Sequence, residues 1–259
     1  MVCGMSLLLA RMTQDLFRLD SYRVEIAASV TAIGPQGITL DRTVFYPMGG
    51  GQAGDAGVLV VTSGALAGQD IAIADTRKGK DAEGRFTADI CHLPAAGLPT
   101  TLAVGDTVSA RIDWQRRYRL MRFHTTTHLL CHLVPQLVNG CSITPDYARL
   151  DFNMTDALDK DVLNAGIAQL VAQAHPVRIG AISDAELDAN PALVKSMSVQ
   201  PPRGGGSIRT VRIGAQQPID LQPCGGTHVA NTLEIGAIVV TKIEKKSAMT
   251  RRVVLGFAT

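Results

Sequence analysis

Two short histidine-containing motifs, far apart in the chain, constrain its fold more than any other feature. His124 and His128 lie four residues apart in H-T-T-T-H, and Cys224 and His228 have the same spacing in P-C-G-G-T-H. Positions i and i+4 of a helix share one face, so both imidazoles of the first motif can point at one ion. The glycines of the second motif allow a tight turn that brings sulfur and imidazole together. Three nitrogens and one thiolate suit tetrahedral zinc, so we predict one zinc ion per chain and a fold that joins both motifs.

The alternative interpretation is that these histidines are ordinary buried residues, as we expect for His92, His132 and His175. His132 continues the i+4 series, so a supporting role beside the metal stays open for it. A metalloprotease of the H-E-x-x-H type is excluded, because Thr125 follows His124 where that motif has its glutamate base.

Composition and charge indicate the compartment and the kind of partner. Five cysteines, an odd number, fit a reducing compartment, so we expect a cytoplasmic protein. The apolar run at 6–10 is too short to span a membrane, and we infer neither a membrane association nor a stable protein partner. Residues 115–259 contain 16 Lys and Arg against 11 Asp and Glu. Clusters of such basic residues suit the phosphates of a nucleic acid, although solvated surfaces explain them equally well.

The segment patterns predict two domains and an α+β fold class. Residues 1–114 contain short apolar or alternating segments between glycine turns, which predict a small antiparallel β-barrel. Residues 115–259 predict helices packed on one face of an antiparallel sheet. The expected strands are 22–26, 38–40, 58–61, 71–73, 108–112, 208–213, 235–243 and 253–255, and the expected helices are 115–133, 156–174 and a shorter one from 184.

A glycine-rich loop within the predicted N-terminal domain reads G-G-G-Q at Gly49–Gln52. Three successive glycines exceed what a hairpin needs, and such a run often lets the backbone approach a ligand closely. A flexible surface turn is the alternative. The run lacks the Gly-Lys-Ser/Thr of a P-loop, which argues against nucleotide binding of that kind.

Three motifs, in this order, resemble the alanyl-tRNA editing proteins, the freestanding relatives of the editing domain of alanyl-tRNA synthetase. The motifs are Y-P-M-G-G-G-Q at 46–52, H-T-T-T-H-L-L at 124–130 and C-G-G-T-H at 224–228, supported by segments 148–152, 242–246 and 251–253. The glycine–glutamine motif in an N-terminal barrel is typical of the medium-length class. The resemblance begins near Met12, which leaves residues 1–11 as an extension or a misassigned start.

The resemblance implies a zinc-dependent aminoacyl-tRNA hydrolase that cleaves the ester of serine, or of glycine, mischarged onto alanine tRNA. Such an activity is needed because a pocket built for a methyl group cannot strongly exclude an added hydroxyl. In this family the zinc ligands match His124, His128, Cys224 and His228. The resemblance also implies substrate contacts at Gly51, Gln52 and a hydroxyl residue, for which Thr144 is the best match and Ser142 the alternative.

We expect the acceptor end of tRNA(Ala) to contact the C-terminal basic cluster Lys245, Lys246, Arg251 and Arg252. Solvated or structural roles for these side chains are the alternative.

Some residues depart from the family's usual pattern. Met48 and Ala53 stand where an acidic residue and a proline are common, Thr126 replaces a frequent alanine, and Thr250 replaces a frequent asparagine. None of these removes a predicted ligand.

Two other functions stay open: a threonine-tRNA editing hydrolase and a non-catalytic tRNA-binding module with structural zinc. Four protein ligands make a closed site, which suits the second of these, whereas a catalytic zinc keeps one position open. If the site is catalytic, either one ligand, first of all His228, is displaced, or the zinc organises the 3′-adenosine and a nearby water without binding that water.

Overall fold

The computed structural model describes residues 13–258, so the proposed extension at 1–11 lies outside the described residues. The mixed α+β class is confirmed. Contacts divide the chain into two compact units: the first contains the residues up to Pro47 together with Gly54–Asp113, and the second contains Met48–Ala53 and Trp114–Thr259. None of the helices between residues 13 and 258 has the length and apolar character that crossing a membrane requires.

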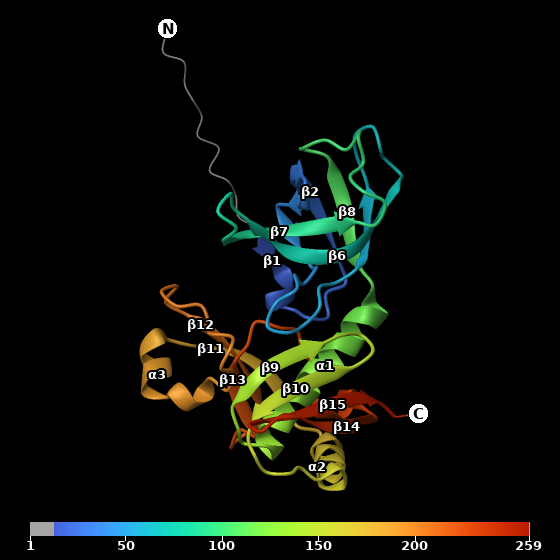
Figure 1. The fold of residues 1–259 in the computed structure, drawn as a ribbon. Helices are drawn as coiled ribbons and strands as arrows, with labels where there is room; N and C mark the ends of the chain where they lie inside the picture. The colour runs from blue at the N-terminus through green and yellow to red at the C-terminus, as the bar shows by residue number, and fades with distance from the viewer. Residues whose placement is uncertain (1–12, 259) are drawn as a thin grey trace. The chain divides into compact units, whose positions relative to one another are not determined.

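The first unit is built on strands that pair in the closed order β2-β3-β7-β6-β5-β8 (Figure 1). Pairing of β2 with β8 closes the ring into a barrel. The strands alternate between buried and less buried positions: Val108, Ala110 and Ile112 of β8 face inward. This period-2 pattern is what a barrel with a side-chain core requires. The strands of this unit are β1 (Gln14–Asp15), β2 (Glu25–Gly34), β3 (Gly37–Leu40), β4 (Arg42–Thr43), β5 (Gly57–Val61), β6 (Asp70–Lys80), β7 (Phe86–Pro94) and β8 (Thr107–Ile112).

The barrel interior contains His92, which has no exposed surface. Its Nδ1 lies 2.9 Å from the Ile38 carbonyl oxygen, and its Nε2 lies 2.8 Å from the Thr43 hydroxyl. Burial lowers the pKa of this imidazole to about 4. His92 is therefore a satisfied, neutral core residue, as the sequence predicted.

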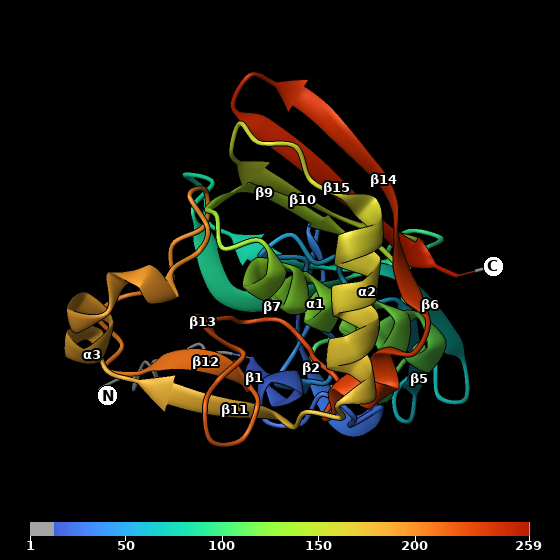
Figure 2. The ribbon, with the colours of Figure 1, turned by 90° about the horizontal axis from the view of Figure 1, so that it is seen from below.

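The second unit places helices α1 (Trp114–Leu133) and α2 (Lys160–Ala172) against an antiparallel sheet of order β14-β15-β10-β9 (Figure 2). Its core consists of apolar side chains from the sheet and both helices, including Phe123, Leu150, Ile167 and Val253. The strands of this sheet are β9 (Val138–Ile143), β10 (Ala148–Asn153), β14 (Ile238–Ser247) and β15 (Thr250–Phe257). The core holds α1 rigidly, which matters because this helix carries the first histidine motif.

A smaller sheet of order β11-β12-β13 leads the chain to the second motif. Strand β13 pairs with β12 in register Thr210 to Pro223 and Ile213 to Asp220, so its end is fixed just before Cys224. The remaining elements of this unit are β11 (Val177–Ile182), α3 (Asp184–Ala189), β12 (Ile208–Ile213), β13 (Asp220–Pro223) and two short 3-10 helices at Pro191–Leu193 and Thr232–Ile235.

Candidate metal centre

Helix α1 supplies two imidazoles to a buried cluster in the second unit. His124 and His128 lie one turn apart, are 6% and 4% exposed, and have ring centroids 5.4 Å apart. Threonines fill the positions between them, and each donates its hydroxyl hydrogen to a carbonyl of its own helix, such as Thr126 Oγ1 to Arg122 O at 2.8 Å. The i, i+4 spacing therefore has the consequence predicted from the sequence: both rings project toward the same point.

The turn after β13 supplies the other two side chains. Cys224 is partly buried and His228 is 4% exposed. A Cβ atom added to Gly226 would lie 2.1 Å from His124 Cε1 and 2.9 Å from Gln52 Oε1. Glycine is therefore required here because the backbone passes directly against an imidazole. The close approach brings Cys224 to His124.

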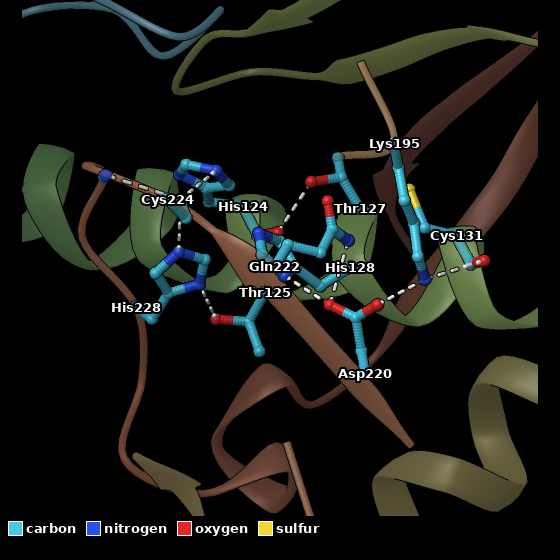
Figure 3. Close-up of polar contacts among 11 residues, drawn as sticks. His124, Thr125, Thr127, His128, Cys131, Lys195, Asp220, Gln222, Cys224 and His228 are labelled. Atoms are coloured by element: carbon cyan, nitrogen blue, oxygen red, sulfur yellow. Dashed lines mark hydrogen bonds and ion pairs between the residues drawn. The ribbon is translucent and has the colours of Figure 1, made fainter. Parts of the chain in front are cut away.

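The donor atoms of His124, His128, Cys224 and His228 all lie within 4.8 Å of one another. Cys224 Sγ is 3.5 Å from His124 Nε2 and 3.3 Å from His228 Nε2 (Figure 3). A tetrahedral zinc with ordinary bond lengths would separate sulfur from nitrogen by about 3.6 Å. The cluster could therefore hold a metal ion, and its donor types and spacing fit a tetrahedral one.

Electrostatics favours the donor form of two of the four side chains. Burial raises the pKa of the Cys224 thiol, but His124 and His228 outweigh this and lower it well below its ordinary value. Burial lowers the pKa of His228 to about 3. Burial also lowers the pKa of His128, but Asp220 and Cys224 together outweigh burial and raise the value to about 9. The site thus favours a thiolate and a neutral His228, while a metal must displace a proton from His128.

Asp220 is a site residue that the sequence reasoning missed. It is 2% exposed, and its Oδ2 accepts a hydrogen bond from His128 Nδ1 at 2.7 Å. Its Oδ1 pairs with Lys195 Nζ at 2.5 Å, and Gln222 Nε2 donates to its Oδ2 at 2.9 Å (Figure 3). A signal was present in the sequence: residues 220, 222 and 224 alternate along a strand, so they share a face.

The glycine-rich loop makes its contacts within the second unit, although we expected it to belong to the N-terminal domain. Gln52 forms a parallel bridge with Ile143, whose amide donates to Gly51 O at 2.8 Å. Gly51 has φ of +86°, and an added Cβ would lie 2.8 Å from Cys141 Sγ. Both the left-handed backbone and the lack of space require glycine at this position.

Gln52 is fully buried and points at the cluster. Its Oε1 lies 2.7 Å from His124 Nδ1 and accepts from the Thr227 amide at 3.2 Å, while its Nε2 donates to Thr227 Oγ1 at 2.9 Å. The loop and both histidine motifs are thus joined through one side chain. His132, which could have supported the metal, is exposed and lies outside the cluster.

Of the two hydroxyl candidates, Thr144 lies at the β9–β10 turn and Ser142 lies near the end of β9. Thr144 is partly exposed, and its hydroxyl donates to Tyr147 O at 2.9 Å and accepts from the amides of the same turn. Ser142 is partly buried and pairs with Arg149 in the strand register. Ile143 lies between them, and its amide donates to Gly51 O. Both candidates are therefore sequence neighbours of the residue that pairs with the glycine-rich loop.

The four basic residues at the C-terminus divide into two kinds. Lys245 and Lys246 are exposed. Arg251 is 8% exposed and donates to the carbonyls of Ser247, Ala248, Thr250 and Thr155. Arg252 forms a two-bond ion pair with Asp151, at 2.7 and 2.9 Å. We expected all four to contact a tRNA; the two arginines have acceptors within the protein, whereas the two lysines are exposed on the neighbouring strand.

Comparisons with known proteins place this geometry in context. Residues 13–116 match the model of the tRNA synthetases class II (A), and residues 208–254 match the threonyl and alanyl tRNA synthetase second additional domain. The alanyl-tRNA editing protein AlaX-M of Methanosarcina barkeri is 34% identical over 251 residues, which cover 93% of this chain and 97% of that protein. AlaX-M of Saccharolobus solfataricus is 35% identical over 253 residues, with 93% and 98% covered. The alanine–tRNA ligase of Saccharolobus islandicus is 30% identical over 243 residues, which are 90% of this chain but 25% of the ligase.

Proposed function

Because the chain belongs to the alanyl-tRNA editing proteins, we propose that it hydrolyses the ester bond of alanine tRNA mischarged with serine, with glycine as a second substrate. The observation that carries the proposal is the buried cluster of three imidazoles and one thiolate beside the glycine-rich loop. A substrate of this kind would place the protein in the cytoplasm, in agreement with its cysteine usage.

We assign one zinc ion per chain to His124, His128, Cys224 and His228. Nitrogen and thiolate donors favour zinc over magnesium or calcium, which prefer oxygen. The sulfur–nitrogen distances of 3.5 and 3.3 Å support this assignment. A zinc ion bound here would supply Lewis-acid chemistry, polarising an ester carbonyl or lowering the pKa of a water.

The chain's own residues would orient the reactants. Cys224 is the partly exposed member of the cluster, and Gly51 is exposed next to Gln52, which contacts His124 in the same unit. We propose that the aminoacyl group lies between the Gly51 backbone and the β9–β10 turn, with Gly51 and Thr144 in contact with it. Gln52 has no exposed surface, so its influence on the substrate would pass through His124.

Contacts with the tRNA acceptor end are assigned to Lys245 and Lys246, whose ammonium groups are exposed on β14. Arg251 and Arg252 would support this interface by holding the β14–β15 hairpin and its neighbour β10 in place. In this proposal the second unit is the editing domain, which takes in the glycine-rich loop as well as the predicted 115–259, and the barrel of the first unit is an accessory domain whose described residues supply none of the four ligands.

A deacylation assay on alanine tRNA charged with serine, glycine or alanine tests the proposal, with zinc content measured on the same sample. We expect Ser-tRNA(Ala) to be hydrolysed and correctly charged Ala-tRNA(Ala) to be spared. Cleavage of Ser-tRNA(Thr) in preference would favour a threonine-tRNA editor. Zinc and tRNA binding without hydrolysis would favour the non-catalytic module.

A further inference from the structure

The imidazoles of the cluster have their second nitrogen atoms engaged by three different protein groups. We propose that Gln52, Asp220 and Thr125 are positioning residues, each of which holds one histidine by its Nδ1 atom so that its Nε2 atom faces the metal. The inference rests on the proposed zinc site. It assigns a role to each of these side chains that is separate from contact with substrate or metal.

Thr125 fixes the tautomer of His228. Its hydroxyl has a single hydrogen, which it donates to the Met121 carbonyl at 2.9 Å within α1. The same oxygen lies 3.1 Å from His228 Nδ1. Because the hydroxyl hydrogen is already used, the oxygen must accept here, so Nδ1 carries the proton. The lone pair of His228 is therefore on Nε2, the atom 3.3 Å from Cys224 Sγ.

Gln52 fixes the tautomer of His124 by the same reasoning. The backbone amide of Thr227 can only donate, and it lies 3.2 Å from one terminal atom of the Gln52 side chain, which must therefore be the oxygen. His124 Nδ1 is 2.7 Å from this oxygen, so it also donates. Nε2 is again left free to face Cys224 Sγ, at 3.5 Å.

Asp220 fixes His128, and it does so with a negative charge. Its carboxylate accepts from His128 Nδ1 at 2.7 Å, and Lys195 and Gln222 hold both of its oxygens (Figure 3). A buried charge is stable when it is paired and hydrogen-bonded in this way. Carboxylate–histidine–metal arrangements orient the ring and make the imidazole a stronger donor.

The three acceptors are unequal, and the inequality has a consequence for the site. Asp220 is an anion, Gln52 a neutral amide, and Thr125 a hydroxyl whose oxygen also accepts from the Val229 amide at 3.3 Å. Charged acceptors make stronger hydrogen bonds than neutral ones. His128 is therefore the strongest nitrogen donor, and His124 and His228 are weaker, because each has a neutral acceptor that is shared with a backbone amide. His128 is thus the histidine that would leave least readily when a position on the metal must open.

The test compares substitutions at adjacent threonines of α1. Thr125→Val removes the hydroxyl that holds His228, and Thr125→Ser keeps it. Thr126→Val is the matched control, because Thr126 is equally buried and its hydroxyl donates to a helix carbonyl, Arg122 O, instead of lying against an imidazole nitrogen. Zinc affinity is measured on the full chain by competition with a chromogenic chelator. The visible absorption of the cobalt(II)-substituted protein reports the coordination geometry.

We expect Thr125→Val to weaken zinc binding by about 10- to 100-fold and to change the cobalt spectrum, as loss of such partners does in other metal sites. Thr125→Ser and Thr126→Val should both resemble the unsubstituted protein. Equal affinities and spectra for Thr125→Val and Thr126→Val would overturn the inference. An unsubstituted protein that binds no zinc would instead overturn the proposed metal site.

A second pair of variants tests the charged partner. Asp220→Asn should weaken zinc binding by a similar or larger factor, whereas Asp151→Asn, which removes a carboxylate paired with Arg252, should leave it unchanged. Equal zinc affinity in these two variants would contradict the role of Asp220. If Asp220→Asn does not fold because Lys195 loses its partner, Lys195→Met with Asp220→Asn removes the unpaired charge and gives the same comparison.

Discussion

Substitution of Gly226 by alanine should remove metal from the site while leaving the rest of the fold in place. The new Cβ would lie 2.1 Å from His124 Cε1 and 2.4 Å from its Nδ1. Ordinary contact between such atoms needs about 3.4 Å or more, so ring and backbone must separate by roughly 1.3 Å. Metal bonds tolerate deviations of only about 0.2 Å. The turn that carries Cys224 and the imidazole of His124 therefore cannot both keep the positions that metal binding requires.

The size of the effect follows from the number of ligands. Structural zinc sites bind with apparent free energies of about 10–16 kcal/mol. Shared equally among four ligands, this is about 2.5–4 kcal/mol for the loss of His124, which corresponds to roughly 10²- to 10³-fold in zinc affinity. Displacement of Gln52, whose Oε1 would lie 2.9 Å from the new Cβ, would add to the loss. Overpacking should also cost about 1–3 kcal/mol of folding stability.

Competition with a chromogenic chelator measures the affinity, and urea unfolding of the same samples measures the stability. Gly205→Ala is the control, since an added Cβ there meets nothing within 4 Å and the residue lies in the same unit. We expect the control to bind zinc like the unsubstituted chain. A Gly226→Ala protein that keeps its full zinc affinity would refute the reasoning, because the close approach would then not be what holds the ligands together.

Four further outcomes are expected. Cys224→Ala should lose most of its zinc by elemental analysis, whereas Cys91→Ala, in the barrel, should lose none. The pKa of His92 is about 4 in the folded chain against 6.5 ordinarily. Between these two pH values His92 is protonated in the unfolded chain and neutral in the folded chain. Stability should therefore fall by up to about 3 kcal/mol as the pH drops from 7 to 4, measured by urea unfolding relative to His92→Gln. Lys245→Gln should weaken tRNA binding and reduce its salt slope by about one unit. Equal salt slopes for the unsubstituted chain and Lys245→Gln would contradict the assignment. Arg251→Met should lower the free energy of unfolding by about 2–3 kcal/mol, since the hydrogen bonds of a buried, charged donor are lost.

The two histidine motifs were predictable because each depends on local geometry. His124 and His128 follow from the helix period, and helix α1, Trp114–Leu133, begins within one residue of the predicted 115–133. Helix α2 begins later than expected, at Lys160, because the side chain of Asp159 accepts from the amides of Asp161 and Val162 and caps it there. Local patterns thus predict an element well, and its start is decided by a single polar side chain.

Several strands were not predicted, although one carries a clear signal. Strand β10, Ala148–Asn153, alternates between buried and half-buried residues throughout. Its sequence A-R-L-D-F-N has polar residues at every second position, which is the pattern of a strand with one buried face. Strand β9 contains Asn139 and Gly140 and shows no such alternation, since only its end residues, Val138 and Ile143, are buried. Its pairing with β10 is a long-range property that no local pattern reveals.

The alternation of side chains between the two faces of a strand also decides which polar residues belong to a site and which belong to the core. Asp220 and Cys224 are four residues apart, so the alternation of an extended chain puts them on the same face. The Asp220 carboxylate consequently lies beside His128. The same rule applies to Arg251, which has the parity of the buried residues Val253 and Leu255 of β15. Its charge therefore faces carbonyl oxygens of the protein, and a basic run in the sequence overstates the positive surface available to RNA.

Only Lys245 and Lys246 of the predicted tRNA-binding cluster combine charge with exposure. Neutralising both should consequently weaken tRNA binding more than neutralising Arg252, whose charge is already balanced by Asp151.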